Sequence, residues 1–273
     1  MDINQHKLQG SDFIKSPNIG NQFKAGRPDS IVIHYTAGGS AESSIRTLTN
    51  PDIKASAHLV VARDGKITQL VAFDTIAWHA GVSRHNNRSG MNGYSIGIEI
   101  DNAGLLEKNG STYTSWFGRK YNPSDVYNGI HRNESTLKHW HQYTEEQITT
   151  VEELCRQLVR TYNIKFILGH EEISPGRKID PGPAFPLDKL RQRIFQPGRD
   201  DETEPEIIFP VTATVNASKL NIRKGAGRDH IQAAPALAKG KRMNVLEEKN
   251  DWYRVTTTIE GWVAKEYVKL EPQ

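Results

Sequence analysis

The sequence has 273 residues, of which 25% are charged and 36% are hydrophobic, and its formal net charge at pH 7 is +3. This composition is typical of a globular protein, and the length suits one large domain or a main domain with an appended module. The small net charge permits an anionic surface as partner but gives no reason to expect nucleic acid. No apolar run approaches the length needed to cross a bilayer, so we expect no membrane span.

Targeting signals and cysteine content set further limits. Residues 1–7 lack the apolar core of a secretory signal, which predicts a cytoplasmic location. A periplasmic or secreted location is expected instead if a leader precedes the sequence given. The single cysteine, Cys155, lies in an apolar helical pattern and is expected to be a core thiol, which excludes a disulfide framework within the chain.

The first part of the chain predicts an arm followed by short strands. Residues 1–24 are polar, with Gly and Pro, and predict an N-terminal arm. Residues 30–36 are an apolar, β-branched run that carries His34 near its carboxyl end, where open α/β sheets place their sites. The elements expected next are a short helix at 41–48, a strand at 57–61, a hairpin turn at Asp64-Gly65 and a strand at 66–71.

A carboxylate interrupts the following predicted strand. Residues 94–100 are otherwise mostly apolar around Glu99, and a buried carboxylate is costly unless it is paired or takes part in chemistry. Residues 102–143 then form a long polar and aromatic excursion. An insertion of this length in a compact domain is usually a functional loop.

The chain then returns to a regular pattern. Thr144 and Gln147 form a capping box for a helix that runs to about Tyr162. A short apolar run at 166–168 predicts a buried strand, and a stiff loop rich in Pro and Gly follows it before a last helix ending near residue 196. Together these patterns predict an α/β domain over residues 25–196, with a mixed central β-sheet flanked by helices.

A second, smaller module is expected at the C-terminal side. Residues 197–210 contain five acidic residues among prolines in their first ten positions and predict a linker, because they offer nothing to bury. Residues 211–273 change to short β runs separated by turns, which predicts a small all-β barrel. The five strands are expected near residues 213–215, 220–223, 243–246, 252–255 and 261–263.

Three side chains of the α/β domain suit a zinc site. His34 ends one predicted strand, His170 follows another, and Asp180 lies ten residues later in the stiff loop. Zn²⁺ accepts His nitrogen and Asp oxygen, and three protein ligands leave one position for water, as in catalytic zinc sites. The competing interpretation is an ordinary strand-to-helix loop with a surface histidine.

Hydrolysis of an amide by metal-activated water also needs a base and a cation. Glu99 fits the base, and Lys178 fits the cation that stabilises the developing oxyanion. Glu99 could instead be the buried partner of an arginine. Cys155 is not expected to act as a nucleophile, because its helical setting offers no adjacent base.

The other histidines leave alternatives open. His58 and His79 lie in or near strands, and each could be a metal ligand, a substrate contact or a core histidine with satisfied hydrogen bonds. The three histidines of the excursion are expected at the surface: His131, His139 and His141.

At this point the sequence resembles a known family. Five segments, in the family's order, are similar to type 2 N-acetylmuramoyl-L-alanine amidases, the AmpD-like group related to phage amidase lysozymes and peptidoglycan recognition proteins. The segments are IHYTAG at 33–38, SAHLV at 56–60, AWHAG at 77–81, SIGIE at 95–99 and 169–183 from Gly169-His170 to Pro183. The resemblance covers about residues 25–195 and implies the amidase type 2 fold.

The resemblance also implies roles for single residues. It implies zinc on His34, His170 and Asp180, with Glu99 as base and Lys178 as stabiliser of the tetrahedral intermediate. The bond cut by the family joins the lactyl group of muramic acid to the L-alanine of the stem peptide. Non-catalytic relatives usually lose a ligand, often the third, and this sequence keeps all three. The residues expected to contact substrate are Tyr35, placed directly after the first ligand, and, by similarity, Trp78, Arg88 and Arg177, with His58 and His79 as further candidates.

The C-terminal module resembles a bacterial SH3 domain. The similar segments are residues 220–225, 252–255 and 261–263. This resemblance implies a module that holds cell-wall peptide or glycan near the catalytic domain, where even a weak affinity raises effective concentration. The alternative is a folded cap without a ligand of its own.

The sequence therefore predicts a monomeric, Zn²⁺-dependent amidase acting on peptidoglycan or muropeptides, including anhydro-muropeptide. One alternative is a peptidoglycan-binding protein without activity. Another keeps the chemistry but makes the protein a phage or interbacterial lytic amidase, in place of a muropeptide-recycling enzyme.

Overall fold

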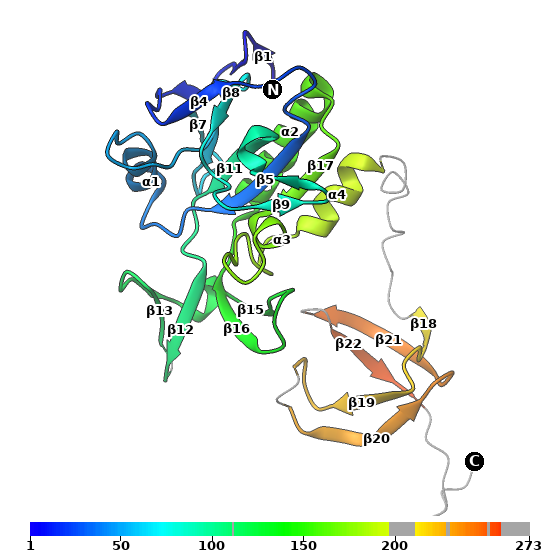
Figure 1. Ribbon diagram of the computed structural model, residues 1–273. Coiled ribbons are helices and arrows are strands. Elements are labelled where there is room, and N and C mark those ends of the chain that lie inside the picture. The colour runs from blue at the N-terminus through cyan, green and yellow to red at the C-terminus, as the bar shows by residue number, and fades with distance from the viewer. Residues whose placement is uncertain (111, 197–210, 228–229, 250–251, 258–273) are drawn as a thin grey trace, which may run out of the picture. The chain divides into compact units, whose positions relative to one another are not determined.

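The computed structural model describes residues 1–110, 112–196, 211–227, 230–249 and 252–257, in two compact units, Met1–Pro197 and Gly198–Gln273. Each unit is considered by itself. The first is an α/β unit and the second is built from strands (Figure 1). The fold class expected from the sequence is confirmed for the first unit.

A six-stranded sheet forms the centre of the first unit. Its four strands from β17 to β6 are parallel, β7 runs antiparallel to β6, and β3 runs parallel to β7. A mixed sheet was therefore predicted correctly. The strand order is β17 (Phe166–Gly169), β5 (Ser30–Tyr35), β11 (Ser95–Ile100), β6 (Leu59–Val61), β7 (Ile67–Gln69) and β3 (Asp12–Phe13).

Helices cover both faces of this sheet. On one face, α2 (Glu145–Tyr162) and α4 (Leu187–Phe195) bury apolar side chains against β5, β11 and β6. The other face is covered by α1 (Ala41–Leu48) near β6 and by the short α3 (His170–Ile173) near β5. Burial of each large apolar side chain contributes about 1.5–3 kcal/mol, so these contacts fix the sheet that carries the site.

The period-two alternation of strand side chains decides which residues meet at the site. Ile31 and Ile33 of β5 belong to the core beneath α2, and Val32 belongs to the opposite cluster. His34 therefore lies on the same side of the sheet as Val32. In β11 the residues opposite Val32 and His34 are Gly97 and Glu99.

The predicted helix ends are confirmed. Thr144 caps α2, accepting a hydrogen bond from the backbone nitrogen of Gln147 (3.1 Å), while the Gln147 side chain accepts one from the Thr144 nitrogen (3.2 Å). Such a cap stabilises a helix by about 1 kcal/mol. Cys155 is buried in the core as expected, and burial raises the pKa of its thiol. The hairpin around Asp64-Gly65 joins β6 to β7 as expected.

Residues 1–24, expected as an arm, are instead part of the first unit. They contribute β1 (Ile3–Asn4), β2 (Lys7–Leu8), β3 and β4 (Ile19–Gln22), and β4 pairs with β8 (Thr75–Ala77). The anchor is Leu8, whose side chain is buried in the main core and whose nitrogen donates to Gln69 Oε1 (2.8 Å). Strand pairs of two residues leave no periodic signal in a sequence, which explains the difference.

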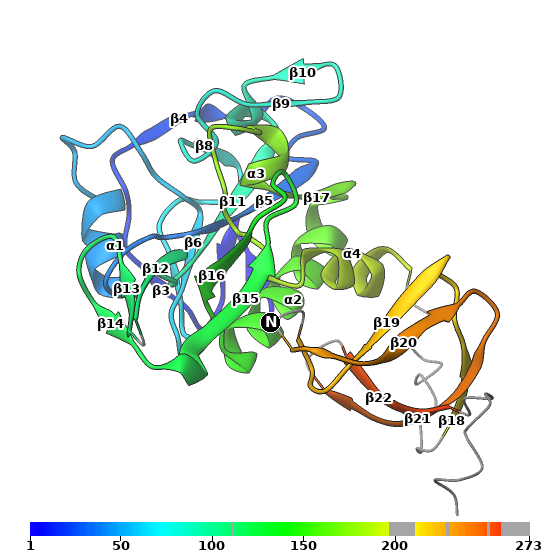
Figure 2. The ribbon, with the colours of Figure 1, turned by 90° about the horizontal axis from the view of Figure 1, so that it is seen from below.

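The excursion is a second, antiparallel sheet. Its five strands lie in the order β14 (Lys120–Tyr121), β13 (Thr112–Ser115), β12 (Leu105–Asn109), β16 (Leu137–His141) and β15 (Val126–Ile130). In the view from below, β12, β15 and β16 lie in front of β5 and β11 (Figure 2). The excursion sheet, residues 102–143, therefore stands over one edge of the central sheet. The remaining short elements are β9 (Arg84–His85), β10 (Arg88–Ser89), η1 (Met91–Gly93) and η2 (Pro123–Asp125).

The second unit agrees with four of its five predicted strands. These are β18 (Val211–Thr214), β19 (Lys219–Arg223), β21 (Arg242–Lys249) and β22 (Trp252–Thr256). The fifth expected strand, 261–263, and the expected linker, 197–210, lie outside the described residues. One strand was not predicted, β20 (Gln232–Ala238), because it contains a proline and no β-branched residue. β18, β21 and β22 form one sheet, and β19 pairs with β20.

Candidate metal centre

The two strands at the middle of the central sheet place two of the predicted site residues side by side. His34 lies near the carboxyl end of β5 and is directly opposite Glu99 of β11 in the parallel register. The β17 strand, on the other side of β5, ends at Gly169, and the next residue, His170, is the first residue of α3. The carboxyl ends of three parallel strands thus converge at one edge of the sheet.

Three ligand atoms meet at this edge. His34 Nδ1 is 2.9 Å from His170 Nδ1 and 3.0 Å from Asp180 Oδ2, and His170 Nδ1 is 2.9 Å from the same carboxylate oxygen. All three residues are buried. Within the described part of the chain this is the group of His, Cys, Asp and Glu side chains that could hold a metal ion.

The loop after α3 is held in place so that Asp180 faces the two histidines. The backbone nitrogen of Glu171 donates to the carbonyl of Asp180 (2.8 Å), and the Glu171 side chain accepts from the nitrogen of Gly182 (3.1 Å). From the excursion sheet, His131 Nε2 also lies 2.6 Å from Glu171 Oε2. Hydrogen bonds to a charged group contribute about 1.5–3 kcal/mol each. Glu171 of α3 therefore holds the end of the loop at residues 180–182 in place.

The protonation states of His34 and Asp180 suit a divalent cation. Burial and the neighbouring His170 lower the pKa of His34 to about 4, so the ring is neutral at pH 7. Burial would raise the pKa of Asp180, but hydrogen bonds from His170 and His34 outweigh it and hold the pKa below its ordinary value. Two imidazoles and one carboxylate, with ligand atoms about 3 Å apart, are a donor set that suits zinc, whose bonds to nitrogen and oxygen are about 2.0–2.2 Å.

Glu99 is half-buried, and one of its carboxylate oxygens, Oε2, is fully buried. Its Oε2 has no hydrogen-bond partner among the described residues. Burial and the nearby charge of Asp180 raise the pKa of Glu99 well above its ordinary value, and Lys178 acts against them. Lys178 also contributes to lowering the pKa of His34, which places its ammonium group within electrostatic reach of both side chains. A proton acceptor and a cation therefore lie beside the three ligand atoms.

Two of the expected substrate contacts lie at the rim of the centre. Tyr35 follows His34 directly, is half-buried, and packs its ring against Gly104, where an added Cβ would lie 2.4 Å from the tyrosine ring. The backbone at Gly104 has a φ of +74°, so glycine is required there for two reasons. Trp78 exposes about a third of its surface. It precedes His79, which lies within 3.0 Å of His34.

Three other expected substrate contacts, Arg88, Arg177 and His79, are bound to other parts of the protein. Arg88 is bound to Asp29, the residue before β5, with an Nη1–Oδ2 distance of 2.8 Å, so it lies at the opposite end of the strand from His34. Arg177 donates to the carbonyls of Ala80 (3.0 Å) and Val82 (2.8 Å) and ties that loop to the end of α3. His79 is buried and contacts His34 instead of the solvent.

His58 is a core histidine. It is fully buried, its Nε2 is 2.9 Å from the carbonyl of Thr75, and its Nδ1 accepts from the nitrogen of Gly97 (3.0 Å). Both ring nitrogens are therefore satisfied by backbone groups, with no nitrogen left for a metal or a substrate.

The buried, neutral state of His58 predicts how stability depends on pH. Burial lowers its pKa to about 4 from 6.5, so the unfolded chain binds the proton first as the pH falls. Stability is therefore lost between pH 6.5 and 4, by up to about 3 kcal/mol for this group. We expect denaturant titrations of the metal-free protein at pH 7 and pH 4.5 to show a smaller loss for His58→Gln than for the native chain. An equal loss in both would contradict this.

Sequence reasoning misplaced one histidine and missed one tryptophan. His131 was expected at the surface but is buried against Trp140 and paired with Glu171, a contact across 40 residues that no local pattern predicts. Trp116, in the turn between β13 and β14, is three-quarters exposed, yet its indole nitrogen donates to the carbonyl of Ala37 (2.7 Å). Ala37 is three residues after His34, so the excursion sheet reaches the loop that follows the first ligand.

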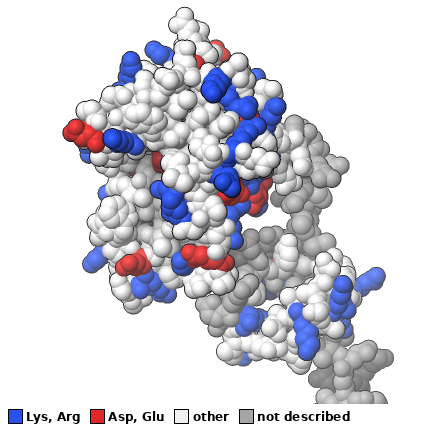
Figure 3. Space-filling view, viewed as in Figure 1, with Lys and Arg blue, Asp and Glu red and all other residues white. Residues whose placement is uncertain are grey.

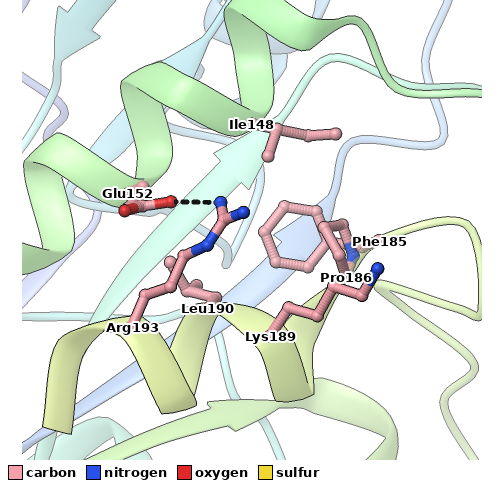
Figure 4. Close-up of a pocket in the computed structure, with 7 residues that line it drawn as sticks. All are labelled: Ile148, Glu152, Phe185, Pro186, Lys189, Leu190 and Arg193. Atoms are coloured by element: carbon pink, nitrogen blue, oxygen red, sulfur yellow. Dashed lines mark hydrogen bonds and ion pairs between the residues drawn. The ribbon is translucent and has the colours of Figure 1, made fainter. Parts of the chain in front are cut away.

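A hollow on the helical face contains none of these residues. It lies between α2 and α4 (Figure 4), where Arg193 Nη1 donates to Glu152 Oε2 (3.0 Å). Its lining residues are Ile148, Glu152, Phe185, Pro186, Lys189, Leu190 and Arg193.

Figure 3 shows Lys and Arg on the visible face in several separate groups, with Asp and Glu between them. No helix among the described residues is long and apolar enough to cross a membrane.

Comparison with known proteins shows which families the two units resemble. Residues 24–183 match the family described as N-acetylmuramoyl-L-alanine amidase, and residues 218–269 match the bacterial SH3 domain. The chain is 33% identical over 172 residues to N-acetylmuramoyl-L-alanine amidase AmiD of Escherichia coli (strain K12), covering 60% of this chain and 52% of AmiD. It is 33% identical over 141 residues to 1,6-anhydro-N-acetylmuramyl-L-alanine amidase AmpD of the same strain, covering 51% and 58%.

The chain thus spans between half and three-fifths of the length of these two relatives. Among solved structures, a selenomethionine derivative of AmpD is 25% identical, with a TM-score of 0.51, and the match covers 71% of this chain and 99% of that one. The family match extends over more than half of the chain. With the metal-type cluster of His34, His170 and Asp180 at the carboxyl edge of the central sheet, these findings show that the chain belongs to the N-acetylmuramoyl-L-alanine amidase family and carries a bacterial SH3 domain after the amidase domain.

Proposed function

We propose that this protein is a zinc-dependent N-acetylmuramoyl-L-alanine amidase that hydrolyses the amide between the lactyl group of muramic acid and L-alanine. The observation that carries the proposal is the convergence of three ligand atoms within 3.0 Å of one another beside a buried Glu99 oxygen that lacks a partner among the described residues. The family membership supports the bond that is cut.

The residues of the site divide the chemistry among them. Zinc held by His34, His170 and Asp180 would polarise the amide carbonyl and acidify a water molecule. Glu99 accepts the proton of that water, and its raised pKa lets it pass the proton on to the leaving amine of L-alanine. Lys178 offsets the negative charge that develops on the carbonyl oxygen. Since every one of these groups comes from one chain, we propose a monomer as the active form.

The substrate proposal rests on the relatives and on the second unit. The name of the AmpD relative specifies a 1,6-anhydro-N-acetylmuramyl substrate, which supports muropeptides as substrates here. The bacterial SH3 domain supports polymeric peptidoglycan, since a wall-binding module raises the local concentration of the amidase domain at its substrate. Tyr35 and Trp78 are the substrate contacts we retain from the sequence.

Trp116 is a further candidate substrate contact, next to the loop that follows His34. Its ring is held by the bond to Ala37 and by edge-on packing against Phe117 (5.7 Å between centroids). A fixed, exposed indole binds flat apolar faces such as those of sugars with little loss of freedom. We expect Trp116→Ala to raise the KM for muropeptide by about 3–10-fold and to leave kcat within about twofold.

The matched control for Trp116 is Leu137→Ala. Leu137 is about half exposed and belongs to the same sheet, in β16, and its apolar side chain cannot form the hydrogen bond that Trp116 makes to the loop after His34. Steady-state kinetics of the two variants should separate the loss of a substrate contact from a general weakening of the sheet. The same KM for Trp116→Ala and the native chain would remove Trp116 from the site.

The proposal is tested by identifying the products. Purified disaccharide muropeptides and sacculi are incubated with the protein in H₂¹⁸O and analysed by mass spectrometry. The proposal predicts a free stem peptide that begins with L-alanine and a lactyl carboxylate that carries one ¹⁸O. Intact muropeptides in both reactions, with binding retained, would instead indicate a peptidoglycan-binding protein.

A further inference from the structure

Residues 169–182, which we call the ligand segment, carry two of the three proposed zinc ligands, and a carboxylate holds each end of this segment. At its start, the Glu172 side chain accepts a hydrogen bond from the backbone nitrogen of Gly169 (2.8 Å). At its end, the Glu171 side chain accepts one from the backbone nitrogen of Gly182 (3.1 Å). Each bond therefore fixes the backbone within two residues of a proposed ligand.

Both carboxylates are in contact with the excursion sheet. His131 Nε2 lies 2.6 Å from Glu171 Oε2, and Arg132 Nε lies 2.8 Å from Glu171 Oε1. Arg132 also binds the Glu172 carboxylate through Nη1. The Asn133 side chain donates to the backbone carbonyl of Glu171 (3.1 Å). Three consecutive residues that follow β15 thus hold both carboxylates of the ligand segment.

The burial of this contact favours a geometric role. The side chain of Glu171 is 3% exposed and that of His131 is 1% exposed. Burying a carboxylate costs several kcal/mol, and a buried ion pair often contributes no more net stability than apolar residues of the same size. Removing one partner is nevertheless costly, because it leaves a buried charge without compensation. The pair therefore restricts the chain to one arrangement more than it stabilises the fold.

Aromatic side chains of the excursion sheet pack on the same end of the ligand segment. A Cβ added to Gly182 would lie 3.0 Å from the ring of Trp140 in β16. The Trp140 ring is also stacked on His131, with centroids 5.8 Å apart. Tyr143 donates its hydroxyl hydrogen to the carbonyl of Pro181 (2.8 Å). The polar contacts to the two carboxylates are thus supported by close packing between the same two segments.

We propose that His131 and Arg132 are positioning residues of the metal centre. Through Glu171 and Glu172 they fix both ends of the ligand segment, and so the separation of the two ligands that it carries. Loss of contacts outside the ligand shell typically weakens metal binding about 10–100-fold. By reciprocity, zinc must strengthen the contact between the excursion sheet and the ligand segment. This inference rests on the proposed zinc role of the ligands and is independent of the substrate.

Two variants of the full chain remove the contacts one at a time. His131→Phe keeps an aromatic ring but loses the contact to Glu171, and Arg132→Met keeps a long side chain but loses its charge. The matched control is His139→Phe, because the His139 ring lies 2.6 Å from Asn128 Oδ1 within the excursion sheet. Zinc affinity is measured by competition with a chromophoric chelator, and Tm is measured with and without zinc.

We expect the zinc affinity to be about tenfold lower in His131→Phe and in Arg132→Met, and within about threefold of native in His139→Phe. The zinc-induced rise in Tm should be smaller in the first two variants, whereas a purely structural role would lower Tm equally with and without zinc. Native zinc affinity in either variant would overturn the proposal for that residue. An equal loss in His139→Phe would overturn it for both.

Hydrogen exchange of the native chain tests the inference without any variant. Zinc should slow the exchange of the backbone amides at residues 131–134 and leave the β13–β14 hairpin, residues 112–121, within about twofold. Unchanged exchange at 131–134 on zinc binding would overturn the proposal even if both variants failed to fold. A native chain that binds no zinc would overturn the proposed function as well, whereas native zinc affinity in both variants would overturn this inference alone.

Discussion

Replacing Glu99 by glutamine is expected to abolish amide cleavage and to make the metal-free protein more stable. The loss of a general acid–base group lowers kcat by about 10²–10⁴-fold. Stability should rise because desolvation of the Glu99 carboxylate and the nearby charge of Asp180 raise its pKa, so keeping it ionised costs folding free energy above its unfolded pKa of about 4.5. Muropeptide turnover and thermal unfolding at pH 7 together measure both effects.

The matched control for Glu99 is Glu152→Gln. Glu152 is a carboxylate of α2 that pairs with Arg156 and Arg193, on the helical face of the sheet. We expect this variant to keep native turnover. Glu99→Gln should also keep muropeptide binding and zinc binding, which distinguishes a missing base from a damaged fold. Full turnover by Glu99→Gln would assign the base to another residue.

Removing the carboxylate of Asp180 is expected to have the largest effect on the metal. Asp180→Asn keeps the size of the side chain but replaces a charged ligand by a neutral one, so the affinity for zinc should fall by more than the 10–100-fold typical of outer-shell changes. At a free zinc concentration of 1,000 times the native dissociation constant, zinc stabilises the native chain by about 4 kcal/mol. A 100-fold weaker site retains about 1.4 kcal/mol of this stabilisation under the same conditions.

Thermal unfolding with and without zinc measures this difference directly. The control is Asp188→Asn in α4, an exposed carboxylate that pairs with Arg191 and lies outside the ligand cluster. It should keep the full zinc-induced rise in Tm. If Asp180→Asn showed the same rise as the native chain, Asp180 would not be a ligand.

The sequence was informative wherever chemistry and local pattern coincide. His34 and His170 follow apolar strand runs, Asp180 lies in a stiff loop, and Glu99 interrupts an apolar strand, so each was visible without the fold. In the structure these four residues lie at one edge of the central sheet. The Thr144 cap was equally visible, because a capping box is a local signal.

The parts that could not be predicted depend on contacts between distant segments. The pairing of His131 with Glu171 and the anchoring of Trp116 on Ala37 join residues 40 and 79 positions apart. Arg88 was assigned by similarity although it lies beside Asp29. Such contacts leave no periodic trace in a single sequence.

The most direct test of the account is a zinc titration of the chelator-stripped protein, followed by mass spectrometry of the stem peptide released from muropeptide. The account predicts no release without zinc and a rise in release that saturates at about one zinc per chain. Glu99→Gln should bind the same amount of zinc and release almost nothing. Full release by the stripped protein, or no release at any zinc concentration, would contradict the assignment of a zinc-dependent amidase.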